Sequence, residues 1–155
     1  RASTRDTDST VRWEAAQLLH STRDPEADAV LFDMLVQDSA SAIRKNIVSL
    51  LARRKDPAVT PHLIRALSDT SADVRLAVLD ALAESGDLTS ADAISGALHD
   101  SEETVRLKAI QTLNALQSRR DESVRAAQAD HEQKMREWEE KVRQQQQAQE
   151  AAKKK

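Results

Sequence analysis

The apolar residues of this 155-residue chain follow a pattern that occurs four times. Each copy has an aspartate, a serine or threonine, three variable residues and then a Val-Arg or Ile-Arg pair. The pairs are Val11-Arg12, Ile43-Arg44, Val74-Arg75 and Val105-Arg106, at spacings of 32, 31 and 31 residues. Apolar residues return four, five and eight positions after each Val or Ile, which indicates a helix rather than a strand.

Turn signals and a second apolar stretch separate the copies, so each copy predicts two short helices. We expect helices at about residues 8–22, 25–37, 40–54, 57–68, 71–85, 88–99 and 102–119. Ser39, Thr70 and Ser101 suit the N-cap, and Pro25 and Pro57 suit a first helical turn. The two helices of each copy form a hairpin that is too small to bury its own apolar face. We therefore expect successive hairpins to stack into an all-α solenoid.

These residues resemble short HEAT-like repeats of the phycobilisome-lyase type, in which an aspartate, a Val-Arg pair and an alanine- and leucine-rich helix recur about every thirty residues. The resemblance covers about residues 6–117. It implies a short α-solenoid of helical hairpins, with the second helix of each hairpin lining the concave surface. Such repeats occur in scaffolds, chromophore lyases and enzyme-associated modules, so the resemblance does not fix the function.

The arginine of each pair lies within the apolar arc of its helix, which predicts that it points into the stack. A buried guanidinium needs a carboxylate and backbone carbonyls as partners. We therefore expect each arginine to bind the repeated aspartate that precedes it in the same copy, within an internal Asp–Arg ladder that ties successive repeats. Its members are Asp6, Arg12, Asp38, Arg44, Asp69, Arg75, Asp100 and Arg106. The alternative is an exposed phosphate-binding row in a nucleic-acid-binding HEAT-like module.

A second row, two positions after each Val or Ile, lies opposite the core and contains large apolar residues. We call this row and its polar neighbours the groove row. It consists of Trp13, Gln17, His20, Lys45, Leu76, Asp80, Leu107 and Gln111. Exposed apolar residues rimmed by polar ones are typical of protein interfaces, so we predict that the groove row binds a partner. The alternative is that these leucines are ordinary surface residues and that Trp13 packs on a missing N-terminal neighbour.

The composition changes near residue 120. We expect a repeat array at 1–120, beginning with an incomplete repeat, and a charged helical arm at 121–155 that lacks Leu, Ile, Gly and Pro. Acids precede bases by four residues along the arm, which favours an exposed helix, and one long helix from about residue 102 is compatible with the sequence.

A thin heptad seam ends in Met135, Trp138 and Val142, which we expect to dock on a partner unless the helix stands alone. We expect Gln144–Gln147 and Lys153–Lys155 to be frayed and disordered.

The array begins on the second helix of a hairpin, with no evident cover for its apolar face. That face carries Val11, Ala15, Leu18 and Leu19. Because the end of a solenoid is normally capped by polar residues, we expect that the chain is a fragment or that another protein covers this face.

The amino-acid composition excludes several kinds of metal, catalytic and phosphate-binding site. Without cysteine and with only two glycines, the chain cannot build a thiolate metal site, a cysteine nucleophile or a glycine-rich phosphate loop. Its four histidines occupy non-equivalent repeat positions, and we expect no catalytic residues, no metal site and no cofactor. A net charge of −3 makes nucleic acid the less favoured partner, and no apolar stretch is long enough for membrane insertion. The compartment stays open, with a soluble cytoplasmic location slightly favoured.

We therefore expect a non-catalytic scaffold, adaptor or accessory subunit whose partner is another protein, within a larger assembly. A chromophore-lyase-type accessory component and a nucleic-acid-binding HEAT-like module are the alternatives.

Overall fold

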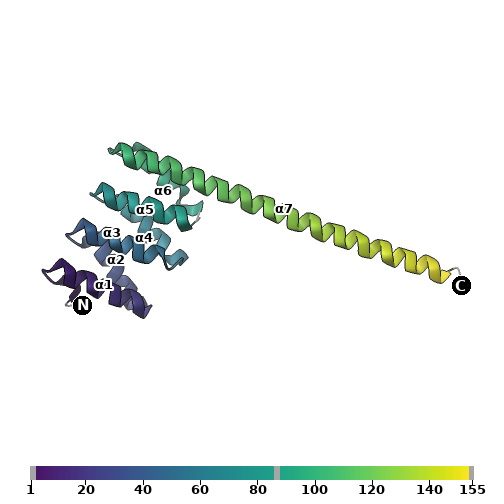
Figure 1. Cartoon of the computed structure of the whole chain (residues 1–155), viewed down its shortest axis with the longest axis horizontal. Helices are drawn as coiled ribbons and strands as arrows, with labels where there is room; N and C mark the ends of the chain where they lie inside the picture. Colours follow the sequence, from purple (N-terminus) through teal and green to yellow (C-terminus); the bar gives the residue numbers. More distant parts are fainter. Residues whose placement is uncertain (1–2, 86–87, 154–155) are drawn as a thin grey trace. The chain divides into compact units, whose positions relative to one another are not determined.

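The computed structural model describes residues 3–85 and 88–153, which form helices and turns without any strand. One layer of helices lies side by side and consists of α1 (Ser9–Thr22), α3 (Ser41–Ala52), α5 (Ala72–Ser85) and the start of α7 (Glu103–Lys153) (Figure 1). The other layer consists of α2 (Pro25–Gln37), α4 (Thr60–Ala66) and α6 (Ala91–Gly96). Short 3-10 turns complete it: η1 (Ser3–Arg5), η2 (Pro57–Val59), η3 (Leu88–Ser90) and η4 (Ala97–His99). The predicted all-α solenoid with a long C-terminal helix is confirmed.

Two predicted helices are divided in the structure. The helix expected at 57–68 is a 3-10 turn followed by α4, because Pro61 has no N–H to donate to the carbonyl of Pro57. The helix expected at 88–99 is η3, α6 and η4, and α6 ends at Gly96, a residue type with a low helix propensity. The second helices of the hairpins begin and end within three residues of the prediction, apart from α7.

Aspartates begin several helices. Asp24 precedes α2 and Asp56 precedes η2, and each accepts a hydrogen bond from the backbone N–H two residues later, at 3.1 and 2.9 Å. The proline that follows each aspartate occupies the first turn, as predicted. The predicted caps Ser39, Thr70 and Ser101 are wrong. The N-cap of α3 is Ala40, without a side-chain bond, and α5 and α7 begin two residues after Thr70 and Ser101.

The carboxylates of the repeated aspartates instead stabilise the turn that precedes each of these helices. Each accepts a hydrogen bond from the backbone N–H two residues later, in the manner of an Asx-turn. The pairs are Ala40 to Asp38 at 2.9 Å, Ser71 to Asp69 at 2.8 Å and Glu102 to Asp100 at 2.9 Å.

Both layers contribute to one continuous core. The stripe predicted from the sequence is buried in the inner repeats, and its fully buried members include Ile47, Leu51, Val78, Leu79, Leu82 and Ala109. From the other layer, Leu31, Leu35 and Ile94 are equally buried. Phe32 of α2 stacks on the ring of His62 of α4, with centroids 3.5 Å apart, so the second layer also packs repeat against repeat. The core thus runs from hairpin to hairpin, as expected of a solenoid.

The chain divides into two compact units, Arg1–Leu116 and Gln117–Lys155, while the sequence placed the boundary at 120. The second unit, which contains the arm, is the continuation of α7 and has almost wholly exposed side chains. Gln144–Gln147, which we expected to be frayed, lie within α7, as does Lys153. Lys154 and Lys155 lie outside the described residues. Over residues 3–85 and 88–153, no helix has both the length and the hydropathy that crossing a membrane requires.

Candidate functional site

The arginines of the first three copies form two-pronged ion pairs with aspartates of the next repeat, so the predicted pairing with the carboxylate that precedes each arginine in its own copy is wrong. Arg12 donates from Nε and Nη2 to the two carboxylate oxygens of Asp38, at 2.8 and 2.9 Å. Arg44 binds Asp69 in the same way at 2.8 and 2.7 Å, and Arg75 binds Asp100 at 2.7 and 2.7 Å. Each pair, which we call a rung, joins residues 25 or 26 positions apart.

The third nitrogen of each guanidinium, Nη1, forms a hydrogen bond within its own repeat. Nη1 donates to the backbone carbonyl of the aspartate that begins the same copy. The acceptors are Asp6 for Arg12, Asp38 for Arg44, Asp69 for Arg75 and Asp100 for Arg106, at 2.8, 2.7, 2.8 and 2.7 Å. Two neighbouring arginines therefore share each of Asp38, Asp69 and Asp100, one at the carboxylate and one at the carbonyl. This arrangement satisfies most of the fixed donors of the guanidinium.

The rungs are buried, and the ionised forms are favoured. Arg12, Arg44, Arg75 and Asp38 are all buried. Burial alone would raise the pKa of Asp38 and Asp69, but hydrogen bonds from arginine and backbone outweigh it and lower both pKa values. For Asp100 the hydrogen bond from Arg75 is the main cause of a lowered pKa. Three of the four arginines are thus held inside the stack and are not available to phosphate groups.

The groove row lies on the helices of the first layer, at differing depths. Gln17, Lys45, Asp80, Leu107 and Gln111 are exposed, whereas Trp13, His20 and Leu76 are half-buried. Trp13 and Leu76 pack against the core, so the prediction that this row lies opposite the core is wrong at these two positions.

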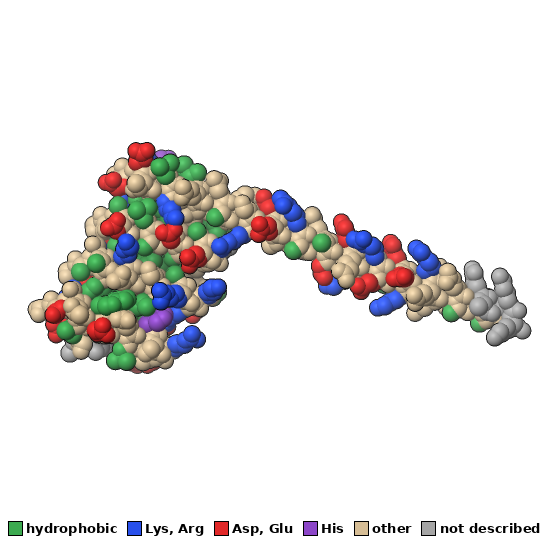
Figure 2. Space-filling view, viewed as in Figure 1, with side chains coloured by type: hydrophobic (Ala, Val, Ile, Leu, Met, Phe, Trp, Pro, Cys, Tyr) green, Lys and Arg blue, Asp and Glu red, His purple; other side chains and the backbone are tan. Residues whose placement is uncertain are grey.

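A cleft of about 370 Å³ runs between α3 and α5 within this row. Lys45, Leu76 and Asp80 line it together with Arg53, Asp73 and Glu84. Asp80 also forms an ion pair with Lys108 of α7, so charges of both signs border the apolar floor. Figure 2 shows the same mixture on the face of the array, with hydrophobic groups between acidic and basic ones and no continuous basic stripe.

A polar cluster that the sequence did not reveal joins three helix ends. Arg54 donates from Nε to Nδ1 of His20 and from Nη2 to the carbonyl of His20, both at 3.0 Å, and it pairs with Asp28. Burial, with the positive charge of Arg54 second, lowers the pKa of His20. His20 therefore accepts the Arg54 hydrogen bond as a neutral ring. The sequence has Ala52, Ala83 and Asn114 at the positions equivalent to His20, so the periodic pattern carries no signal for this cluster.

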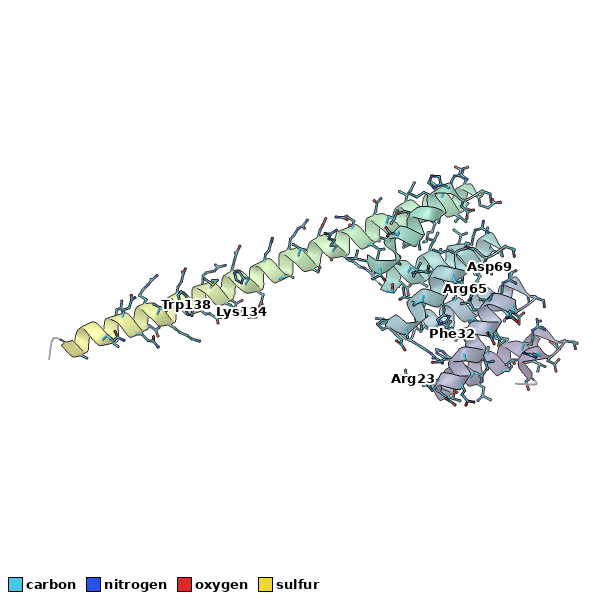
Figure 3. The ribbon with its side chains drawn as sticks, turned by 180° about the vertical axis from the view of Figure 1, so that it is seen from behind. Arg23, Phe32, Arg65, Asp69, Lys134 and Trp138 are labelled. Atoms are coloured by element: carbon cyan, nitrogen blue, oxygen red, sulfur yellow. The ribbon has the colours of Figure 1, made fainter. Side chains whose placement is uncertain are left out.

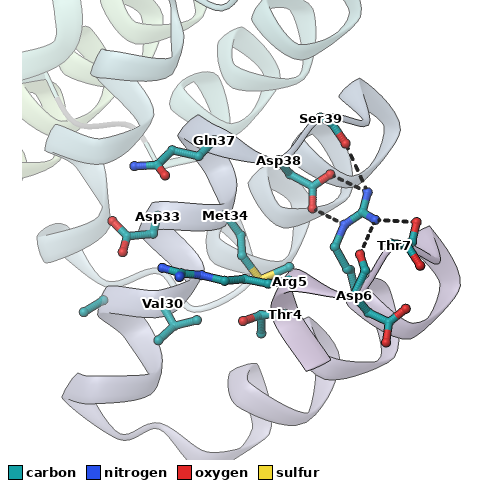
Figure 4. A pocket seen from close by; sticks show the side chains of 12 residues that line it. Thr4, Arg5, Asp6, Thr7, Val30, Asp33, Met34, Gln37, Asp38 and Ser39 are labelled. Atoms are coloured by element: carbon teal, nitrogen blue, oxygen red, sulfur yellow. Dashed lines mark hydrogen bonds and ion pairs between the residues drawn. The ribbon is translucent and has the colours of Figure 1, made fainter. Parts of the chain in front are cut away.

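A larger cleft of about 890 Å³ lies between η1 and α2 (Figure 4). Arg5 extends across it toward Asp33, and Val30 and Met34 contribute apolar lining. The Arg12–Asp38 rung closes one side. Sequence reasoning missed this cleft because η1 is too short to give a periodic pattern. Across the part of the chain that the structure describes, no group of three or more metal-binding side chains is suited to hold an ion.

The predicted docking face of the arm is exposed. Trp138 is 59% exposed and stands out from the helix near Lys134 (Figure 3), and Met135 is 42% exposed. Val142 is half-buried among its neighbours on the same helix. The ion pairs of the arm are local, from Lys134 to Asp130 at 2.7 Å and from Arg136 to Glu132 at 3.5 Å, as the spacing of acids and bases predicts.

Stacked hairpins, one buried Asp–Arg rung between each pair of repeats and a continuous core define an α-solenoid. Three overlapping segments, residues 1–77, 29–114 and 60–141, match the model of the HEAT repeats. The chain therefore belongs to the HEAT-repeat family, as the sequence predicted.

Solved structures add a fold relationship. The chain is similar to human deoxyhypusine hydroxylase in complex with glycerol, with a TM-score of 0.68 and 19% sequence identity. The match covers 79% of this chain and 43% of that chain, so this chain spans less than half of that enzyme chain. An identity this low shows a shared fold alone. No curated protein matches the chain.

Proposed function

We propose that the chain is a non-catalytic scaffold, adaptor or accessory subunit that binds another protein through the groove row. The observation that carries the proposal is the cleft between α3 and α5, which is lined by the apolar Leu76 and by the charged Lys45 and Asp80. An apolar floor with a mixed polar rim suits a protein surface, because burial of the apolar part provides affinity and the rim provides specificity.

The neighbouring positions extend this surface along the first layer of helices. Leu107 is 51% exposed two residues after the buried Val105, and Trp13 holds the equivalent place in the first copy. Tryptophan and well-packed apolar residues are frequent anchors of interfaces. The buried rungs hold these positions at regular intervals, so the row offers a preformed surface to an extended partner.

The arm supplies a second docking face for the same role. Met135 and Trp138 lie three residues apart on an otherwise charged helix, and no other large apolar residue in the described arm is as exposed as Trp138. A sparse apolar face of this kind suits a groove on a partner, with Trp138 as the anchor.

The groove is tested by affinity capture from the native source with the full chain, followed by mass spectrometry. The Leu107→Ser chain should fail to capture a partner protein that the unmodified chain captures. Val36→Ser is the matched control, because Val36 is 49% exposed but lies on α2 in the other layer. Equal capture by the two variants would contradict the groove assignment, and a pigment-bearing protein among the captured partners would favour the chromophore-lyase alternative.

The arm is tested in the same experiment by Trp138→Ala. Truncation after Arg120 should weaken capture, and Trp138→Ala should reproduce most of that loss. Glu140→Ala, two residues away on the opposite side of the arm, should have no effect. If Trp138→Ala behaves like Glu140→Ala, the arm does not dock through its apolar face.

A further inference from the structure

At Ile110 the last repeat presents a surface that every earlier repeat buries. We call Arg106, Ile110 and Leu113 of α7 the end face. Ile110 is 48% exposed, yet its counterparts Ala16, Val48 and Leu79 are 0%, 1% and 0% exposed. Likewise Leu113 is half-buried, whereas Leu51 and Leu82 are fully buried. The inner copies are covered because another repeat follows them, and no repeat pattern follows Leu113 in residues 121–155.

The Arg106 side chain makes the same backbone hydrogen bond as the arginines of the rungs. Its Nη1 donates to the carbonyl of Asp100 at 2.7 Å, as Nη1 of Arg75 donates to Asp69 at 2.8 Å. A second bond from Nη1 goes to the carbonyl of Ser101 at 2.9 Å. In the other three copies Nε and Nη2 hold a carboxylate, but within residues 3–85 and 88–153 these two atoms of Arg106 contact none.

We propose that the end face binds a partner protein that presents an aspartate or glutamate at the start of an apolar helix. The chain itself shows this mode of binding three times, since Asp38, Asp69 and Asp100 each lie three residues before the first residue of a helix and bind the arginine of the preceding repeat. The proposal rests on the proposed role in protein interaction, but it uses a surface separate from the groove row.

Two physical arguments select this partner. A guanidinium edge with two parallel donors matches a carboxylate, and the adjacent Ile110 requires apolar contact that a small anion does not supply. Two copies meeting end face to end face would bring two Arg106 side chains together, and this like-charge contact opposes such a dimer. The partner therefore carries both the acid and the apolar helix.

The test uses a synthetic peptide of residues 67–85, acetylated and amidated, which contains Asp69 and the sequence of α5. It is titrated into the isotope-labelled full chain, and the Nε–H signal of Arg106 and the methyl signals of Ile110 are followed by NMR. We expect saturable shifts confined to the end face. The same peptide with Asp69→Asn should bind at least about tenfold more weakly, the factor that corresponds to about 1.4 kcal/mol.

Variants of the full chain complete the test. Arg106→Gln should abolish peptide binding without altering thermal melting, whereas Arg65→Gln, which removes an exposed arginine of α4, should leave binding intact. Binding that survives Arg106→Gln, or that is lost with the groove variant Lys45→Ala, would overturn the proposal while leaving the groove assignment to its own test. Arg106-dependent self-association in sedimentation would identify a second copy as the occupant instead, and equal shifts with inorganic phosphate would identify a phosphate-bearing ligand.

Discussion

The repeat array and the arm are both helical, but they are held by different kinds of contact. In the array, Arg75 pairs with Asp100, 25 residues away, and both side chains are about 10% exposed. In the arm, Lys134 pairs with Asp130, four residues away, and these side chains are 71% and 62% exposed. The stability of the array therefore depends on distant parts of the chain, whereas the arm depends only on neighbours along one helix.

This difference predicts two kinds of unfolding. Buried contacts between repeats couple each hairpin to the next, so the array should unfold cooperatively. Exposed pairs in a single helix contribute only a few tenths of a kcal/mol each, so the arm should lose helicity gradually. The two regions can be separated experimentally by substitutions that act on one kind of contact at a time.

The largest effect is expected from breaking a rung. Arg75→Ala leaves the carboxylate of Asp100 buried without its ionic partner, and we expect the free energy of unfolding to fall by about 2 to 4 kcal/mol. Urea denaturation followed by circular dichroism measures the change. Arg106→Ala is the matched control, since it removes the same residue type at the same repeat position but breaks no rung, and it should cost less than about 0.5 kcal/mol. Similar losses for the two variants would show that the rungs do not stabilise the array.

The second largest effect is expected from acid, which should lower the free energy of unfolding of the array through its half-buried histidines. Burial lowers the pKa of both His20 and His62 below the 6.5 of an unperturbed imidazole, so the unfolded chain binds more protons than the folded one. Stability is then fully present above pH 6.5 and is lost as the pH falls through the lower folded pKa values. Urea denaturation at pH 7.5 and 5.0 should show this loss.

His20→Gln should reduce the pH dependence, because glutamine still offers an acceptor to Arg54 but does not titrate. His131→Gln, in the exposed arm, should leave the dependence of the array unchanged. The ladder aspartates affect stability at a lower pH than the histidines. Because their pKa values in the folded chain are lowered from 3.8, they stabilise the fold above about pH 3.8, and this stabilisation is lost as the pH falls through the folded pKa values. A flat response between pH 7.5 and 5.0 would contradict the role given to the histidines.

The sequence predicts most of the array because its signals are local and repeated. Asp24-Pro25 and Asp56-Pro57 mark helix starts by elementary backbone chemistry, and the apolar stripe identifies Val78 and Leu82 as core. The burial of the arginine row also follows from the helical wheel.

The pairing within the ladder does not follow from the sequence. Asp69 stands six residues before Arg75 and 25 residues after Arg44, and this proximity in the sequence wrongly favoured Arg75, in the same copy, as the partner of its carboxylate. The packed structure gives the carboxylate to Arg44 and only the carbonyl to Arg75, because the turn that begins α5 points the side chain toward the preceding repeat. The cluster of Arg54 and His20 is equally hidden, since it depends on three helix ends that meet only in the folded stack.

Removal of the arm should have little effect on the array. We expect a chain that ends at Arg120 to keep one cooperative transition, with its free energy of unfolding within about 0.5 kcal/mol of the full chain, because the arm contributes almost no buried apolar surface. The helical signal should fall in proportion to the residues removed. Differential scanning calorimetry of both chains measures the transition. If the truncated array unfolds or melts without cooperativity, the arm serves as a cap on the solenoid, and the docking role proposed for Trp138 must be withdrawn.

The smallest effect is expected from a pair within the arm. Asp130→Asn removes the partner of Lys134 and leaves both side chains in water, so the helix should lose about 0.3 to 0.5 kcal/mol and the array should lose nothing. Amide hydrogen exchange should show faster exchange near residue 130 and unchanged protection around Leu79 and Leu82. Added salt should produce the same local change in the unmodified chain, because exposed pairs are screened while the buried rungs are not. If Asp130→Asn instead lowers protection in the core, the arm is coupled to the array, and the contrast between distant and local contacts does not hold.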